Sequence, residues 1–247
     1  MTIFGGVLLY LGLIGIGVGI LSLVKPFRFL GIRTRMRGLL VAGLGLLAVA
    51  AGIYLPVSET RVETARTRLD EFVPAFQFSE FHTISISASK DRIDAAIWKV
   101  TPGEIRFFST LMWIRFLHGV PGRSPILDTF TAGRFQMLAD DPGREIVLGQ
   151  AGDGHGGRKL TAEEFKALQR APAIKIAMNF RIEEVDATHC RLTTETRVYA
   201  MGSRAVRGFA TYWRMIYPGS SLIRREWLRA IKRRAEAAAD ASPAPVR

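Results

Sequence analysis

Residues 78–88 read F-S-E-F-H-T-I-S-I-S-A, and the character of their side chains alternates with a period of two. The even positions carry Phe78, Glu80, His82, Ile84 and Ile86, whereas the odd positions carry mostly serine and threonine. Successive side chains of a β-strand point to opposite faces, so this alternation predicts a strand. We expect this strand to be the first long element of a globular domain.

The sequence after this strand predicts two helices, a run of strands and a long terminal helix. Ser89 is a suitable N-cap for the first helix, and Thr101-Pro102-Gly103-Glu104 reads as a capping box that begins the second. A final helix starts near Val206, is interrupted at Pro218-Gly219 and continues to about residue 239. Between them, glycine, proline and aspartate turn signals separate expected strands at 126–132, 134–139, 145–150, 174–185 and 190–199, with a short helix over 161–170.

Two uncharged segments, residues 1–24 and 38–57, precede the domain. As helices they would extend about 36 Å and about 30 Å, enough to cross the ~30 Å hydrocarbon core of a bilayer. The first lacks the basic start and the small-residue cleavage site of a signal peptide. We therefore expect an integral, two-pass membrane protein with a transmembrane helical hairpin over residues 1–57.

Small residues and charges refine the predicted hairpin. The link between its helices carries five cations and no acid, a pattern that favours the cytoplasmic side, whereas the charges of residues 58–75 are mixed. We expect residues 58–75 to form a stalk and the domain to be extracytoplasmic. The link cations are Lys25, Arg28, Arg33, Arg35 and Arg37. Small residues that would permit close helix packing are Gly12, Gly15, Gly17 and Gly19, and Gly43, Gly45, Ala48 and Gly52.

Composition excludes some classes of function. The net charge is +12, but the cations gather in the hairpin link and in the last helix rather than on one broad basic face with aromatics, so we expect no nucleic-acid partner. The basic group in the last helix suggests contact with anionic lipid headgroups, with a solvated basic helix as the alternative. A single cysteine, Cys190, excludes an intramolecular disulfide.

The element order, together with four short segments, resembles the SRPBCC superfamily, the START-like, helix-grip group that includes polyketide cyclases and lipid-transfer domains. The segments are F-S-E-F-H-T-I-S-I-S-A at 78–88, T-P-G-E-I-R at 101–106, L-T-T-E-T-R-V at 192–198 and F-A-T-Y-W-R at 209–214. The resemblance implies an α+β fold in which a curved antiparallel sheet wraps around a long C-terminal helix. We expect the domain to cover residues 76–239 and residues 240–247 to form a disordered tail.

The resemblance also implies a cavity between sheet and terminal helix that accepts a hydrophobic ligand. The residues expected to line it would equally suit an ordinary core of this fold. They are Met112, Phe135, Phe180, Phe209, Trp213 and Ile216.

Two polar groupings on the expected strands have competing interpretations. Glu80 and His82 share a face with Ile84, as acid/base work near a cavity mouth would require, but such a pair also occurs on solvated surfaces. Glu195 and Arg197 could clamp an anionic ligand or form an ion-pair ladder on the solvated side of the sheet.

The sequence predicts no cofactor and no metal site. The glycines at 152, 154 and 157 match the letters of a dinucleotide fingerprint, but no helix is expected to begin at the last of them and no βαβ unit surrounds them. The four histidines and Cys190 show no metal-ligand spacing.

The leading functional hypothesis is a membrane-anchored module that binds a lipid or another hydrophobic small molecule. One alternative is a cyclase or dehydratase type of enzyme that uses Glu80 and His82, although a non-enzyme is favoured. The other is a non-binding interaction module whose cavity is filled by its own side chains.

Overall fold

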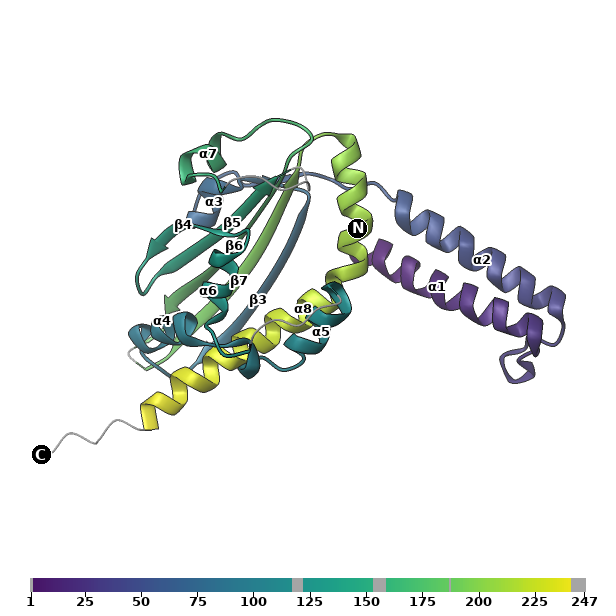
Figure 1. Cartoon of the computed structure of the whole chain (residues 1–247), viewed down its shortest axis with the longest axis horizontal. Coiled ribbons are helices and arrows are strands. Elements are labelled where there is room, and N and C mark those ends of the chain that lie inside the picture. Colours follow the sequence, from purple (N-terminus) through teal and green to yellow (C-terminus); the bar gives the residue numbers. More distant parts are fainter. Residues whose placement is uncertain (1, 117–121, 153–158, 187, 241–247) are drawn as a thin grey trace, which may run out of the picture. The chain divides into compact units, whose positions relative to one another are not determined.

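The computed structural model describes residues 2–116, 122–152, 159–186 and 188–240. The chain divides into two compact units. The first contains Met1–Ser58 and Ser203–Tyr217, and the second contains Glu59–Gly202 and Pro218–Arg247. Figure 1 labels most of the helices and strands of both units.

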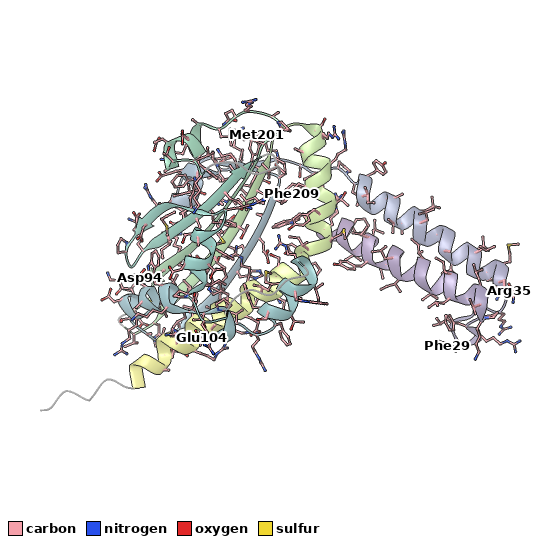
Figure 2. The ribbon with its side chains drawn as sticks, viewed as in Figure 1. Phe29, Arg35, Asp94, Glu104, Met201 and Phe209 are labelled. Atoms are coloured by element: carbon pink, nitrogen blue, oxygen red, sulfur yellow. The ribbon has the colours of Figure 1, made fainter. Side chains whose placement is uncertain are left out.

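Two long helices, α1 (Thr2–Val24) and α2 (Arg35–Tyr54), form most of the first unit. Both are long and apolar enough to cross a membrane. The link between them contains the short helix η1 (Arg28–Leu30), and Figure 2 shows Phe29 and Arg35 at that end of the hairpin. The Thr34 hydroxyl accepts a hydrogen bond from the backbone N–H of Arg37, so α2 begins three residues before the uncharged segment does.

The helices of the hairpin approach each other backbone to backbone through glycines. A Cβ added at Gly12 would lie 2.6 Å from the carbonyl oxygen of Gly45, and one added at Gly45 would lie 2.7 Å from that of Gly12. Neither position can carry a larger residue without moving a helix. A Cβ at Gly17 or Gly43 would meet no atom within 4 Å, so only part of the predicted small-residue set forms the contact.

Arg214 completes the first unit by binding the end of α2. It lies in α8 (Ser203–Asp240), whose residues up to Tyr217 belong to this unit. Its Nη1 donates to the carbonyl of Ile53 at 2.9 Å and its Nη2 to that of Leu55 at 2.7 Å. The last carbonyls of a helix have no partner within the helix, so the Arg214 guanidinium caps α2.

A five-stranded antiparallel sheet with strand order β3-β7-β6-β5-β4 is the centre of the second unit. The strand predicted over residues 78–88 is confirmed, as is the predicted hairpin of the last two strands. The strands are β3 (Phe78–Ile86), β4 (Gln136–Asp141), β5 (Glu145–Gly152), β6 (Ile174–Glu184) and β7 (Cys190–Ala200).

One face of this sheet, the helix face, packs against helices in a single hydrophobic cluster (Figure 1). Trp227 of α8 is 1% exposed, and its ring centroid lies 4.8 Å from that of Phe180 on β6. A sheet covered by a long C-terminal helix is the predicted helix-grip, START-like fold. The other helical elements of this unit's first half are α4 (Lys90–Lys99), η2 (Pro102–Glu104), α5 (Phe108–Phe116) and α6 (Ile126–Ala132).

Two predictions about elements were wrong. Residues 126–132 form the helix α6 rather than a strand, because Ile126 and Leu127 are fully buried on one side and the Thr131 hydroxyl bonds back to the carbonyl of Leu127. The interruption expected at Pro218-Gly219 is absent, since α8 runs as one helix through Pro218 and includes Asp240. The rest of the expected tail, residues 241–247, lies outside the described part of the chain.

The opposite face of the sheet is covered by residues expected to be a stalk and by α7 (Ala162–Ala167). Residues 58–75 contain β1 (Thr60–Arg61) and α3 (Arg68–Phe72), and the strand β2 (Ala75–Phe76) follows. Leu69 is 0% exposed and Phe72 is 1% exposed. From Glu59 onward this segment therefore belongs to the domain's own core, which differs from the expected boundary near residue 75.

A buried polar network holds α3 on the sheet. Arg197 donates to Asp70 at 2.6 Å and to Glu195 at 2.7 Å, and it is only 6% exposed. Glu145 accepts from the backbone N–H of Arg68 at 2.9 Å, which supplies a negative charge at the start of α3. The expectation of a solvated ladder around Glu195 and Arg197 was wrong, because α3 covers them, although the ion pair itself is present.

Replacing Gly45 by valine should separate α1 from α2, because the new side chain would overlap the backbone of Gly12. We expect the hairpin of Gly45→Val to lose about 1 to 3 kcal/mol of stability, measured by titrating the detergent-solubilised chain with SDS. Gly43→Val is the matched control, since its Cβ meets no atom. Equal losses in the two variants would contradict the packing described.

Asp70→Asn should weaken the attachment of α3. Desolvation raises the pKa of Asp70, but hydrogen bonds from the Arg66 backbone, Arg197 and Thr67 outweigh it and hold the pKa below 3.8. The carboxylate therefore stabilises the fold above pH 3.8 and stops doing so as the pH falls through the lowered pKa. We expect a loss of about 1.5 to 3 kcal/mol at neutral pH.

Urea unfolding of the wild type and Asp70→Asn between pH 2.5 and 7 measures this effect. The difference between the two proteins should shrink below pH 3.8. Glu163→Gln is the control, because Glu163 pairs with Lys166 while its side chain is 83% exposed. A difference for Asp70→Asn that is independent of pH would argue against the role of its charge.

Candidate functional site

The helix face of the sheet carries a group of polar side chains within otherwise apolar surroundings. The register of β3 and β7 places Glu80 opposite Thr196 and His82 opposite Thr194. Met178 of β6 lies opposite Thr196 on the other side. Because paired residues share a face, these side chains all point toward the layer that contains α8.

Three residues of α8 complete the group. The Ser220 hydroxyl donates to Glu80 Oε2 at 2.7 Å, and the Ser221 hydroxyl lies 3.4 Å from His82 Nε2. Arg224 donates from Nη2 to the Thr196 hydroxyl and to the Met178 sulfur, each at 2.7 Å. We call these residues the polar cluster: Glu80, His82, Thr194, Thr196, Ser220, Ser221 and Arg224.

The polar cluster contains charges that water hardly reaches. Glu80 is 3% exposed and the His82 side chain 10%. Burial lowers the pKa of Arg224 to about 10, although the nearby charge of Glu80 acts in the opposite direction. Arg224 thus remains protonated at neutral pH, and a cation and a carboxyl group share a poorly hydrated layer.

Glu80, His82 and the two serines of α8 contact one another within the polar cluster. Glu80 binds His82 Nε2 through Oε1 at 2.8 Å and Ser220 through Oε2, so both of its oxygens are engaged. Ser221 approaches the same imidazole nitrogen as Glu80 does, which differs from a catalytic triad, where the two partners use opposite nitrogens. Among the described residues, His82 Nδ1 has no hydrogen-bond partner, whereas Nε2 approaches both Glu80 and Ser221.

The residues predicted to line a cavity fall into both units. Met112 and Phe180 belong to the hydrophobic cluster under α8, and Phe135 packs against it. Phe209, Trp213 and Ile216 belong to the first unit, where the rings of Phe209 and Trp213 stack with centroids 5.9 Å apart.

Sequence reasoning missed the aromatic residue of α8 that packs against Phe180. Ile223, Trp227, Ala230 and Ile231 form an apolar stripe in the second half of α8, and this stripe is the signal that points to Trp227. Ser220, Ser221 and Arg224 follow the expected interruption at Pro218-Gly219, where no local pattern links them to Glu80 and His82. Their role at Glu80 depends on contacts between residues 140 positions apart.

Most of the cations in the second half of α8 bind the domain itself. Arg234 donates to the carboxylate of Glu104 at 3.0 Å, and Arg233 donates to the Glu104 carbonyl (Figure 2 labels Glu104). Lys232 donates to the carbonyl of Ser85 at 2.7 Å, and Arg229 pairs with Glu226. These contacts weaken the case for a free basic face directed at lipid headgroups.

The described residues contain no group of three histidine, cysteine, aspartate or glutamate side chains able to hold a metal ion. His118, His155 and the glycines at 154 and 157 lie outside the described part of the chain.

No family model matches this sequence, and no curated protein matches it. Solved structures with a similar fold include a conserved protein from Geobacillus kaustophilus (11% identity, 65% of this chain and 97% of that one, TM-score 0.36). Two others are the Zhui aromatase/cyclase from Streptomyces (16% identity, 66% and 96%, TM-score 0.28) and human STARD10 (9% identity, 80% and 82%, TM-score 0.25). At these values the matches concern the fold alone, and we assign no ligand or activity from them.

Proposed function

We propose that this chain is a membrane-tethered module that binds a lipid or another hydrophobic small molecule, and that the polar cluster contacts a polar group of that ligand. The observation that carries this proposal is that the buried Glu80 and the partly buried His82 and Arg224 lie on a face whose other residues form a hydrophobic core. Burying ionisable groups costs stability, and apolar residues of similar volume would pack this layer at lower cost.

The acceptors around Arg224 support a ligand that carries an acceptor of its own. A guanidinium has five N–H donors, and the hydrogen-bond acceptors of Arg224 in the described chain are two hydroxyls and a thioether. A carboxylate, ester or phosphate oxygen on the ligand would bind more strongly than these neutral groups do.

The two apolar helices support the tether. Their length and hydropathy fit a bilayer, and the glycine contacts between them let the pair pack without polar groups. A domain beside the bilayer would meet its lipids at high local concentration. The five cations of the link support an extracytoplasmic position for this domain.

A second candidate is an enzyme of the cyclase or dehydratase type, favoured by the 2.8 Å contact between Glu80 and His82. In that case His82 Nδ1 would accept a proton from the substrate or donate one to it, and Glu80 would orient the imidazole ring. A third, an interaction module with a filled interior, would need no polar cluster and is the weakest of the three.

Purification of the full chain in mild detergent, followed by mass spectrometry of the bound molecules, tests the binding proposal. We expect a defined apolar species at close to one per chain, and at least a fivefold lower occupancy in Arg224→Met. Arg225→Met is the matched control, because this neighbouring cation is exposed on α8. The proposal would be overturned if the folded wild-type chain neither copurifies with an apolar molecule nor binds one that is added.

Replacing Arg33, Arg35 and Arg37 by neutral residues should give mixed orientations, because the bias of the link would largely be lost. A reporter fused at the C-terminus measures this. It should show extracytoplasmic activity in the wild type and reduced activity in the triple variant. Activity of a reporter that works only in the cytoplasm would show the opposite orientation.

A further inference from the structure

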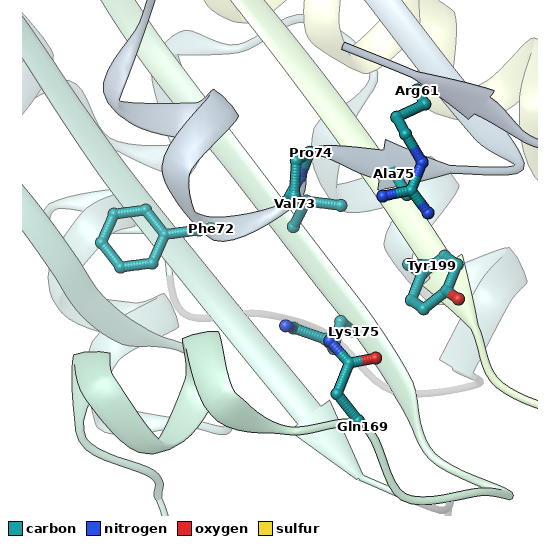
Figure 3. Close-up of a pocket in the computed structure, with 8 residues that line it drawn as sticks. All are labelled: Arg61, Phe72, Val73, Pro74, Ala75, Gln169, Lys175 and Tyr199. Atoms are coloured by element: carbon teal, nitrogen blue, oxygen red, sulfur yellow. The ribbon is translucent and has the colours of Figure 1, made fainter. Parts of the chain in front are cut away.

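A cavity of about 70 Å³ lies on the face of the sheet opposite the polar cluster (Figure 3). Its lining comes from residues 61 and 72–75, from Gln169 after α7, and from the paired strands β6 and β7. The residues are Arg61, Phe72, Val73, Pro74, Ala75, Gln169, Lys175 and Tyr199. Lys175 and Tyr199 are direct partners in the register of the sheet.

Lys175 is the unusual group in this cavity. It is 3% exposed, and its Nζ donates to the carbonyl of Lys166 at 3.2 Å and lies 5.0 Å from the centre of the Phe165 ring. An ammonium group has three donors, and the carbonyl of Lys166 is the one hydrogen-bond acceptor that the described residues give it. Burial lowers the pKa of Lys175 to about 8, so no nearby anion offsets the loss of water.

The charge of the lining is one-sided. Arg61 and Lys175 are cations, Gln169 and Tyr199 offer further donors, and no carboxylate is among the lining residues. Arg61 pairs with Glu59 at 3.2 Å, but the Arg61 side chain is 70% exposed. An exposed ion pair is weak, so the Arg61 side chain can turn toward the cavity at little cost.

The size of the cavity limits the ligand. Pockets for drug-sized or lipid molecules measure about 300 to 1,000 Å³, whereas a water molecule occupies about 30 Å³. A cavity of about 70 Å³ therefore holds two or three waters or one small oxyanion.

We propose that this cavity is a binding site for a small oxyanion, a carboxylate or a phosphate-type group, held by Lys175 and Arg61. The site is separate from the polar cluster and does not depend on the proposed lipid-binding function. Its occupant would supply the acceptor that the Lys175 ammonium lacks. It would also raise the pKa of Lys175, because an opposite charge favours the protonated amine.

Thermal unfolding of the full chain with increasing acetate, phosphate, glycerol 3-phosphate or sodium chloride tests the site at matched ionic strength. We expect at least one oxyanion to raise the melting temperature in a saturable manner beyond chloride. Lys175→Met should remove that shift. Lys166→Met, which deletes a neighbouring cation but keeps the carbonyl that Lys175 binds, should retain it. Binding of phosphate as well as its ester would indicate a phosphate group, and binding of acetate alone a carboxylate.

A second measurement on the wild type keeps the proposal testable if Lys175→Met does not fold. Reductive methylation followed by peptide mass spectrometry gives the pH dependence of labelling at each lysine. Lys175 should label with a midpoint near pH 8, and the binding oxyanion should move this midpoint upward and slow the labelling. No saturable shift in melting temperature together with an unchanged Lys175 midpoint would overturn the proposal.

Discussion

The two-residue period of the central strands is the constraint on which both polar regions of the domain depend. On β7, Thr194 and Thr196 point to the helix face, while Glu195 and Arg197 point to the opposite face. A slip of one residue in the pairing would exchange these sets. It would move Arg197 to the helix face and move Thr194 and Thr196, the partners of Arg224, to the opposite face. The polar cluster, the network at Asp70 and the cavity at Lys175 therefore require the same register.

Local patterns in the sequence were sufficient for much of this sheet and for the hairpin. The alternation of residues 78–86 predicted β3, and the apolar segments predicted α1 and α2, because both signals come from neighbouring residues. The strand prediction for residues 126–132 was wrong because it, too, relied on neighbouring residues alone. Isoleucine, threonine and phenylalanine favour strands locally, but burial of Ile126 and Leu127 against other elements decides for α6.

Residues 58–75 show why composition alone placed the start of the domain too late in the sequence. Asp70 and the N-terminal turn of α3 look solvated in the sequence, yet their partners are Arg197, 127 positions away, and Glu145, 77 positions from Arg68. The candidate site was hidden in the same way. Glu80 and His82 were visible as a pair, but Ser220 and Arg224 join them only through the packing of α8 on the sheet.

The surroundings of Arg197, Arg224 and Lys175 separate structural charges from those suited to a ligand. Desolvation lowers the pKa of Arg197, but hydrogen bonds and charge from Glu195 and Asp70 outweigh it and raise the pKa above its usual range. The pKa values of Arg224 and Lys175 are lowered, mainly by desolvation. Arg197 thus has its counter-ions within the fold, and its role in holding α3 explains why this charge is buried.

Arg224 and Lys175 bear the cost of burial without a bound carboxylate, since their hydrogen-bond acceptors in the described chain are neutral. A negatively charged or strongly accepting ligand group would offset the desolvation of the cation in both places. That interaction would contribute to the free energy of ligand binding. The two faces of the sheet differ in the space and the walls that surround the cation. On one face Arg224 adjoins a hydrophobic layer, and on the other Lys175 adjoins a cavity of about 70 Å³.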